Sequence, residues 1–160
     1  MENEVYKLLE QLSIDYTKIE HPPLFSCEDN EKYNIKINAL ICKNLFIHNS
    51  NKSQYYIVIL TLEKKIDFKY IQNLLSETRL SFGDKKVLEE KLGIKTGSVS
   101  IFNIINQKYN DIIYILDKDI LKYEKVGFHP NINTQTLIFD SKEIIKILEH
   151  YNVTYKFIAI

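Results

Sequence analysis

The chain has 160 residues, a size at which one hydrophobic core can bury most of the surface of the unfolded chain. Hydrophobic residues make up 45% of it, and 21 Lys and Arg residues balance 21 Asp and Glu residues, so the formal net charge is zero. These values exclude a disordered chain, a fibrous repeat and a protein that binds polyanions through an overall basic charge. We expect one domain over residues 1–160, in which any contact with a polyanion is local.

Cysteine usage and the distribution of apolar residues predict a soluble, cytoplasmic protein. The two cysteines, Cys27 and Cys42, form no C-x-x-C pair and no His/Cys cluster, so neither a metal site nor a disulfide framework is expected. The chain starts without the basic and apolar segments of a targeting sequence, and no apolar run reaches the roughly 20 residues that span a membrane. We expect no membrane contact and no cofactor.

The N-terminal part of the sequence predicts a helix, a strand and a loop. Apolar residues recur at helical spacing over residues 5–12, and residues 16–20 alternate as in a strand. His21-Pro22-Pro23 then requires extended or turn geometry, because a residue before proline avoids the helical region and proline has no N–H. A Ser-x-x-Asp capping box at Ser26 predicts a second helix over residues 27–33.

The middle of the chain predicts a hairpin followed by two helices. Residues 39–48 and 55–62 are rich in β-branched and aromatic residues and flank a turn-forming segment, so we expect paired strands. Asp67 has the position of an N-cap for the next apolar helical pattern. A further helix with apolar residues over residues 87–92 is expected to end at Gly93.

The C-terminal part predicts further strands and one helix. Strands are expected over residues 111–117, 125–128, 134–139 and 153–158. Asp140 and Glu143 have the spacing of a capping box, which predicts a helix with apolar residues over 144–148. Strands that alternate with helices and also form hairpins predict a single-domain α/β fold, with helices packed on a mixed, largely antiparallel sheet.

Lys43 and Asn44 interrupt an otherwise apolar predicted strand. Removing an ammonium group from water is unfavourable unless an anion or a set of acceptors receives it, so Lys43 is a candidate ligand-binding residue, with the amide of Asn44 beside it. The alternative is a lysine at the edge of the sheet whose head group reaches water. The sequence leaves both interpretations open.

Gly97-Ser98-Val99-Ser100 forms a second candidate motif. A loop that begins with glycine can present consecutive backbone N–H groups, and such arrangements bind anions or oxyanions. The alternative is an ordinary turn in which Ser98 or Ser100 caps the next helix.

A third motif, Phe128-His129-Pro130-Asn131, places one histidine beside several side-chain amides and hydroxyls. A histidine in this setting can bind or orient a ligand, although turn histidines commonly have structural roles. Other catalytic signatures are absent from the sequence, including the G-x-S-x-G elbow of serine hydrolases and the phosphate-binding Walker loop.

Four segments together carry a resemblance to a known family: His21–Phe25, Lys43–Phe46, Leu92–Ser100 and Phe128–Asn131. Their order resembles the YbaK/prolyl-tRNA-editing family, in particular its free-standing ProX/PrdX-type aminoacyl-tRNA deacylases. The resemblance implies the fold of the YbaK and ProRS-associated editing domain. It also implies a trans-editing hydrolase that cleaves the ester between a wrongly attached amino acid and the tRNA 3′ end, with alanyl-tRNA(Pro) as substrate.

The resemblance also implies roles for individual residues. The catalytic set would be Lys43, Gly97, Ser98 and His129. The substrate-binding set would be Asn44, Val99, Ser100, Phe128 and Asn131. In this mechanism the lysine offsets negative charge, backbone N–H groups of the glycine loop hold the carbonyl or the attacking water, and no covalent intermediate forms.

The partners implied by the resemblance are the aminoacylated 3′ end of tRNA and, transiently, prolyl-tRNA synthetase or an elongation factor. Arg79 is the only arginine, so lysines would make most of the phosphate contacts, and binding would depend on salt. Ile101 stands where the family often has proline, and residues 27–30 differ from the usual family segment. A cysteinyl-tRNA(Pro) deacylase of the same fold and a non-catalytic tRNA-binding or regulatory paralogue therefore stay open as alternatives.

Overall fold

The computed structural model describes residues 2–24, 38–95, 99–106 and 111–160. The α-helices in these ranges are α1 (Glu2–Gln11), α3 (Phe68–Leu75), α4 (Lys85–Leu92) and α5 (Glu143–His150). The strands are β1 (Thr17–Glu20), β2 (Leu40–His48), β3 (Tyr55–Thr61), β4 (Ser81–Phe82), β5 (Ile112–Asp117), β6 (Lys125–Phe128), β7 (Gln135–Asp140) and β8 (Tyr155–Ile158). Two 3₁₀ helices are η1 (Ile101–Asn106) and η2 (Lys118–Lys122). The helix predicted over residues 27–33 lies outside the described residues.

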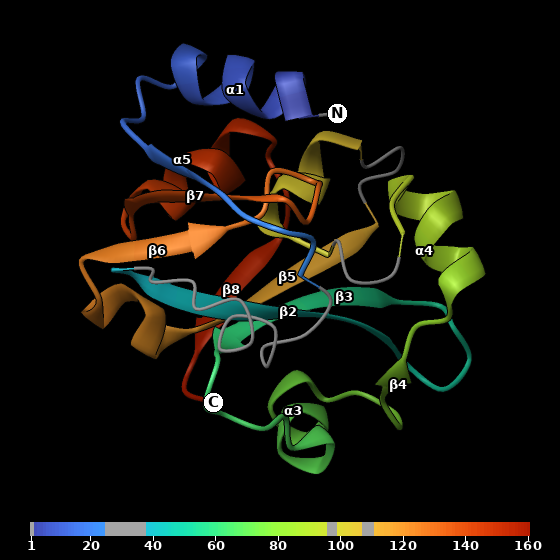
Figure 1. Cartoon of the computed structure of the whole chain (residues 1–160). Helices are drawn as coiled ribbons and strands as arrows, with labels where there is room; N and C mark the ends of the chain where they lie inside the picture. The colour runs from blue at the N-terminus through green and yellow to red at the C-terminus, as the bar shows by residue number, and fades with distance from the viewer. Residues whose placement is uncertain (1, 25–37, 96–98, 107–110) are drawn as a thin grey trace.

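The strands form one sheet in the order β1-β7-β6-β2-β3-β5-β8, with β4 also paired to β2 (Figure 1). The pairs β1–β7, β6–β7, β2–β3 and β2–β4 are antiparallel. The pairs β2–β6, β3–β5 and β5–β8 are parallel. The mixed, largely antiparallel sheet predicted from the sequence is confirmed, and its predicted hairpin is formed by β2 and β3.

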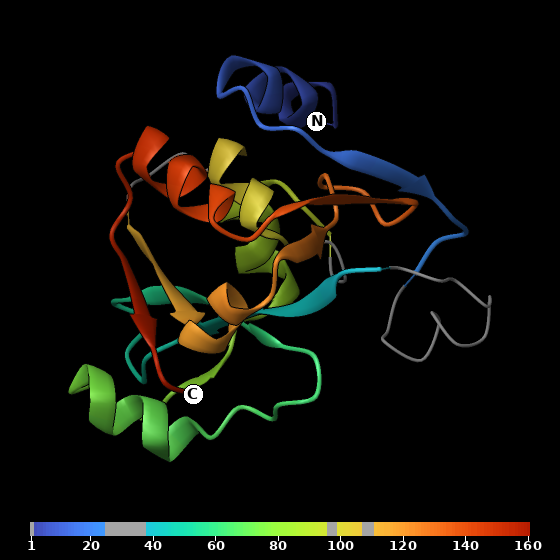
Figure 2. The same cartoon turned by 90° about the vertical axis from the view of Figure 1, so that its left-hand side faces the viewer.

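Helices cover the two faces of the sheet unequally. On one side α1, α4, α5 and η1 pack over a larger core, which includes Leu9, Phe102, Tyr114, Phe128 and Phe139. On the other side α3 covers a smaller core around Ile47, Leu60 and Ile71. Figure 2 shows α3 below the sheet and the other helices above it. None of the helices in the described ranges is long and apolar enough to cross a membrane.

Three helix ends follow the local sequence signals. The Asp67 carboxylate accepts a hydrogen bond from the Tyr70 N–H at 3.2 Å, and Asp84 caps α4 in the same way through Val87. Gly93 ends α4 with a φ of 64°, a left-handed conformation that glycine adopts without a steric penalty. The predicted N-cap at Asp67 and the predicted end at Gly93 are confirmed.

The capping box predicted at Asp140 is wrong. Helix α5 begins after Lys142, which makes no side-chain capping hydrogen bond. Asp140 is instead the last residue of β7, where the register places it opposite Lys125, and the two side chains form an ion pair of 2.7 Å. The carboxylate is engaged across the strand pair, so it is not available to the helix.

Candidate functional site

Strand alternation places Lys43 and His129 on the same side of the sheet. Successive strand residues point to opposite faces, and Val126 and Phe128 of β6 point into the larger core. Gly127 therefore faces the other way, and it pairs in register with Ile41 of β2. Lys43 follows Ile41 by two residues on that face. His129 comes just after the end of β6 and lies against His21, which is hydrogen-bonded to Thr136, a neighbour of Gly127 on the same face.

One edge of β2 has no strand partner around Lys43 within the described residues. The ladder to β6 ends at Ile41, and the ladder to β4 on the same edge begins at Ile47. The intervening stretch pairs only on its other edge, with β3. Lys43 is half-buried there and forms no ion pair with any described residue. Backbone donors and acceptors and an ammonium group thus lie together on this edge of the strand.

His129 is held as a neutral imidazole. Its Nδ1 lies 2.9 Å from the carbonyl oxygen of Gln135, which can only accept, so Nδ1 carries the proton and Nε2 keeps a lone pair. Burial lowers the pKa of His129, and the nearby His21 lowers it further, while the hydrogen bond to Gln135 opposes them. At neutral pH the side chain can therefore accept a hydrogen bond through Nε2.

His21 stands against His129, with ring centroids 6.0 Å apart in an edge-to-face arrangement. Its Nδ1 donates to the carbonyl oxygen of Pro22 at 2.9 Å, and in the neutral ring its Nε2 accepts from the hydroxyl of Thr136 at 2.8 Å. Backbone hydrogen bonds from His21 to Thr134 and from Leu24 to Asn133 fasten the segment to the turn after β6. Two of the four segments that carry the family resemblance, those that begin at His21 and at Phe128, are therefore neighbours.

A buried network of amides ties the segment at Ser100 to the turn at His129. The Ser100 hydroxyl donates to the His129 carbonyl oxygen at 2.7 Å, and the Ser100 N–H donates to Asn103 Oδ1 at 2.7 Å. Asn103 Nδ2 donates to Asn131 Oδ1 at 2.6 Å, and Asn131 Nδ2 donates to the Phe102 carbonyl oxygen at 3.1 Å. Asn131 has a φ of 65°, which asparagine tolerates better than most residues. The network fixes the backbone on which His129 stands.

The remaining predicted site residues have different surroundings. Ser100 also accepts from the Phe102 N–H at 3.3 Å, which is a capping contact at the start of η1. Asn44 points to the side opposite Lys43, and its Oδ1 is buried without a hydrogen-bond partner among the described residues. Phe128 is 2% exposed and packs against Phe102 and Phe139 in the larger core. Val99 is half-buried and packs on the same core, whereas Gly97 and Ser98 lie outside the described residues.

One contributor to this site was not singled out from the sequence. Asn103 joins two loops, and the signal available for it was its position three residues after Ser100, the spacing of a side-chain cap. Thr136 is one of the hydroxyls expected near His129, but its hydrogen bond to His21 spans 115 residues of sequence, so no local pattern indicates this partner.

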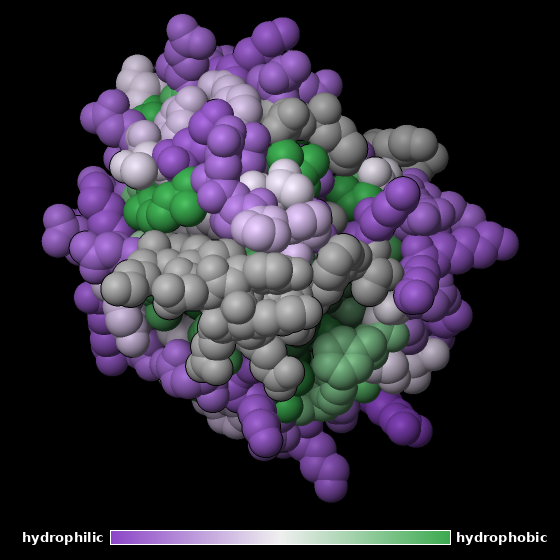
Figure 3. All heavy atoms as spheres, viewed as in Figure 1, coloured by the Kyte–Doolittle hydropathy of each residue, from purple (hydrophilic) through white to green (hydrophobic). Residues whose placement is uncertain are grey.

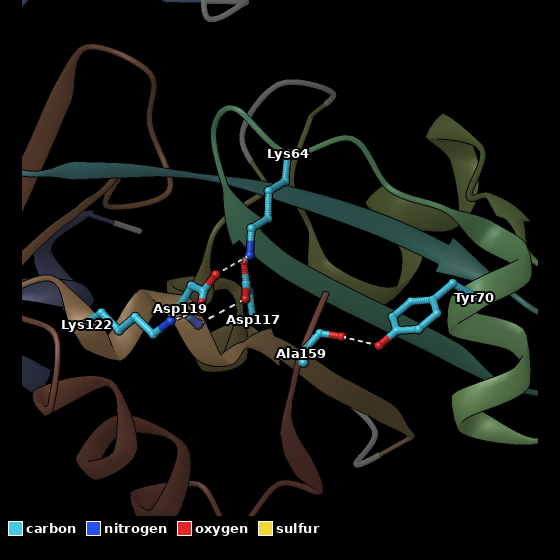
Figure 4. Close-up of polar contacts among 6 residues, drawn as sticks. All are labelled: Lys64, Tyr70, Asp117, Asp119, Lys122 and Ala159. Atoms are coloured by element: carbon cyan, nitrogen blue, oxygen red, sulfur yellow. Dashed lines mark hydrogen bonds and ion pairs between the residues drawn. The ribbon is translucent and has the colours of Figure 1, made fainter.

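An ionic cluster lies two strands away from Lys43 on the same face. Asp117 ends β5 and is 0% exposed, and its carboxylate lies 2.8 Å from Lys64 Nζ. Asp119 lies 2.6 Å from Lys64 and 2.8 Å from Lys122 (Figure 4). Hydrogen bonds from Lys122 and then Lys64 lower the pKa of Asp119 to about 2. On the opposite face, burial and then Asp117 raise the pKa of the Cys42 thiol to about 12, so this cysteine is a neutral core residue.

No group of three or more His, Cys, Asp or Glu side chains in residues 2–24, 38–95, 99–106 and 111–160 is arranged to hold a metal ion. What the described site offers is a cation, a neutral imidazole acceptor and unpaired strand edge groups. Such groups can bind and polarise an ester without a nucleophilic side chain.

Known proteins resemble the chain over most of its length. Residues 21–147 match the family described as the aminoacyl-tRNA editing domain. The chain belongs to the aminoacyl-tRNA editing domain family. An aminoacyl-tRNA editing domain is a deacylase, an enzyme that hydrolyses the ester between an amino acid and tRNA, so tRNA is its substrate.

Relatives of this editing domain extend over most of the chain. It is 33% identical over 152 residues to the prolyl-tRNA editing protein ProX of Acetoanaerobium sticklandii, covering 95% of this chain and 93% of that protein. The chain is also 27% identical to prolyl-tRNA synthetase associated domain-containing protein 1 of Mus musculus. That match covers 84% of this chain and 81% of the mouse protein. The crystal structure of a proposed trans-editing enzyme for prolyl tRNA synthetase superposes with a TM-score of 0.73 at 15% identity, covering 99% and 96%, which supports the fold.

Proposed function

We propose that this editing domain removes alanine from mischarged alanyl-tRNA(Pro). The observation that carries the proposal is the presence of Lys43 and a neutral His129 on one face of the sheet, beside the stretch of β2 that has no strand partner on this edge among the described residues. Similarity to a prolyl-tRNA editing protein over 95% of the chain supports the proline connection. Alanine is the expected error because it fits within a pocket made for proline, and apolar contacts discriminate such pairs by only about 10- to 200-fold.

In this proposal the residues position an ester that is already reactive. Lys43 offsets the negative charge that develops on the carbonyl oxygen during attack by water. His129 accepts a hydrogen bond through Nε2, either from the α-amino group or from a ribose hydroxyl, and so fixes the orientation of the ligand. Backbone N–H groups of Gly97, Ser98 and Val99 remain the proposed donors to the carbonyl or the attacking water, whereas the Ser100 N–H is already donated to Asn103 Oδ1.

A small amino acid fits the packing beneath the site. A Cβ atom built on Gly127 would lie 2.7 Å from Ile41 Cδ1 and 3.0 Å from Thr136 Cγ2, so the face between β2, β6 and β7 is already filled to contact. Phe128 supports this floor from the core side. Phe128→Ala removes the ring that supports the floor, so the variant is expected to hydrolyse esters of larger amino acids as well. His129→Ala is expected to lower the rate without extending the range of substrates.

The test is deacylation of alanyl-, cysteinyl- and prolyl-tRNA(Pro) by the unmodified protein. Alanyl-tRNA(Pro) is expected to be hydrolysed fastest, and prolyl-tRNA(Pro) is expected to survive because its larger ring overlaps the floor of the site. If the cysteinyl ester is hydrolysed faster, the preferred substrate is cysteinyl-tRNA(Pro) and the proposal for alanine is wrong. No hydrolysis of any of the three, in a protein that still binds tRNA, would support the non-catalytic paralogue.

A further inference from the structure

A groove separate from the candidate site lies between α3 and β4. It is an open groove of about 690 Å³, and the residues that line it include Phe68, Lys69, Gln72, Arg79, Leu80 and Phe82. This volume lies within the range of about 300–1,000 Å³ that is typical of ligand sites. The groove is therefore large enough to take a group the size of a nucleotide.

The groove combines exposed aromatic surface with exposed cationic side chains. Phe82 is 57% exposed, and its ring meets that of Phe68 edge-to-face at 5.1 Å, so the two rings form an apolar floor. Lys69 and Arg79 are exposed on its rim, and neither forms an ion pair with any residue in the described ranges. Aromatic faces with nearby cations are the combination that binds unpaired bases and their phosphates.

The walls of the groove are fixed. The Leu80 N–H donates to Gln72 Oε1 at 3.0 Å, which joins the segment before β4 to α3. The Tyr70 hydroxyl donates to the Ala159 carbonyl oxygen at 2.6 Å, and Figure 4 shows this ring reaching from α3 toward the C-terminal segment. Lys64, just before α3, is held by the ionic cluster at Asp117. A ligand would thus meet a formed surface and need to order little of it.

The groove borders the same edge of β2 as Lys43, where the described part of the chain supplies no strand partner. Phe82 of β4 pairs with Ile47, which lies four residues from Lys43 on the same face of β2, a distance of about 13 Å along the strand. Figure 3 shows apolar side chains gathered on this side of the molecule, over the region of α3 and β4. The aminoacylated end of an RNA bound beside Lys43 would therefore lie about 13 Å along β2 from the strand pair that borders the groove.

We propose that the groove between α3 and β4 binds the tRNA substrate outside its aminoacylated adenosine, with an unpaired base against Phe82 and phosphates beside Lys69 and Arg79. The inference rests on the proposed function for its substrate. Charge complementarity favours RNA as the occupant, because the chain is neutral overall and yet places its one arginine on this rim. Arginine matches phosphate with a planar fork of donors that lysine lacks.

The experiment separates binding from chemistry. Arg79→Ala, Lys69→Ala and Phe82→Ala are compared with the unmodified chain in three assays: binding of uncharged tRNA(Pro), hydrolysis of alanyl-tRNA(Pro), and hydrolysis of alanyl-adenosine, which lacks the rest of the tRNA. Arg79→Lys keeps the positive charge but removes the planar guanidinium, so it separates the contribution of the donor geometry from that of the charge. Lys7→Ala, an exposed lysine of α1 at the opposite end of the molecule in Figure 1, is the matched control.

Each groove variant is expected to weaken tRNA binding and to lower kcat/KM for alanyl-tRNA(Pro) by about three- to tenfold, with alanyl-adenosine hydrolysis unchanged. Arg79→Ala should also reduce the slope of log affinity against log salt by about one unit, and Lys7→Ala should change nothing. Unchanged tRNA binding in all three variants, or equal losses on both esters, would overturn the proposal. Groove-dependent tRNA binding without hydrolysis of either ester would instead refute the proposed function alone.

Discussion

Two polar clusters lie on this sheet, and they are built differently. Around His129, a chain of neutral amides and hydroxyls through Ser100, Asn103 and Asn131 fixes two loops without using any charge. Around Asp117, two lysines and two carboxylates neutralise one another. The neutral cluster contains no carboxylate, so Lys43 beside it has no ion-pair partner among the described residues. In the ionic cluster, by contrast, Lys64 is paired with both carboxylates. We infer that the first positions a ligand and the second holds α3 in place.

Removing the buried carboxylate should give the largest effect and should act on stability. Asp117→Ala leaves Lys64 without its buried partner and deprives η2 of the side chain that accepts from the Asp119 N–H at 3.0 Å. We expect a loss of about 3 kcal/mol in the free energy of unfolding, measured by urea denaturation, with the rate per folded molecule retained. Lys64→Met should behave similarly. A strong loss of rate in a folded Lys64→Met protein would contradict the division between the clusters.

Breaking the neutral network should affect both stability and rate. Asn131→Ala removes two hydrogen bonds and leaves alanine at a φ of 65°, so we expect a loss of about 2 kcal/mol together with slower deacylation. Asn131→Gly relieves the backbone strain but not the lost hydrogen bonds, and should recover only part of the stability. Recovery of full stability by glycine would show that the amide contacts contribute nothing.

Lys43→Ala should affect the rate alone. We expect deacylation to fall by about tenfold, equivalent to about 1.4 kcal/mol in the activation free energy, because the charge on the carbonyl oxygen is no longer offset. The lysine is half-buried and unpaired among the described residues, so the urea midpoint should hardly change. Near-normal turnover by the folded variant would remove Lys43 from the mechanism, and Lys64→Met is the control for loss of a paired lysine.

Titration of His129 should give the smallest effect. Since its pKa is lowered from 6.5 chiefly by burial, the neutral form persists below that pH, and rate and stability are retained through neutrality. The folded pKa lies below the unfolded one, so this stabilising contribution is complete above the unfolded pKa and is lost as the pH falls through the folded value. A rate profile corrected for spontaneous ester hydrolysis should therefore fall on the acid side, and His129→Ala should flatten it. A midpoint above 6.5 would contradict the lowered pKa.

Local signals predicted the elements well because each of them acts within a few residues. Asp67 caps α3 through an N–H three residues away, and Gly93 ends α4 through its own backbone conformation. Asp140 misled the same reasoning because its partner Lys125 is distant in sequence and adjacent only in the sheet. The two-residue strand β4 was missed because it is defined by its pairing with β2 and carries no periodicity of its own.

The candidate site was predictable in its residue types but not in its geometry. Lys43 was conspicuous because a charge interrupts an apolar strand, but strand alternation places Asn44 on the opposite face, away from the lysine it was expected to assist. Phe128 was expected beside the ligand, and the structure shows it in the core, one residue from a histidine that faces the other way. Asp117 gave no sequence signal, because the burial of a carboxylate depends on a lysine from another segment.

The pairing of β2 with β6 has a consequence for the order in which the protein is made. Leu40 and Ile41 find their partners Val126 and Gly127 only after some 85 further residues, and Thr17 of β1 waits for Ile138 of β7. The β2–β3 hairpin can close as soon as both strands have left the ribosome, but the face that joins Lys43 to His129 cannot. A nascent chain therefore carries the lysine through most of its synthesis without a working site, and deacylation begins only when the last third of the polypeptide has folded onto the first.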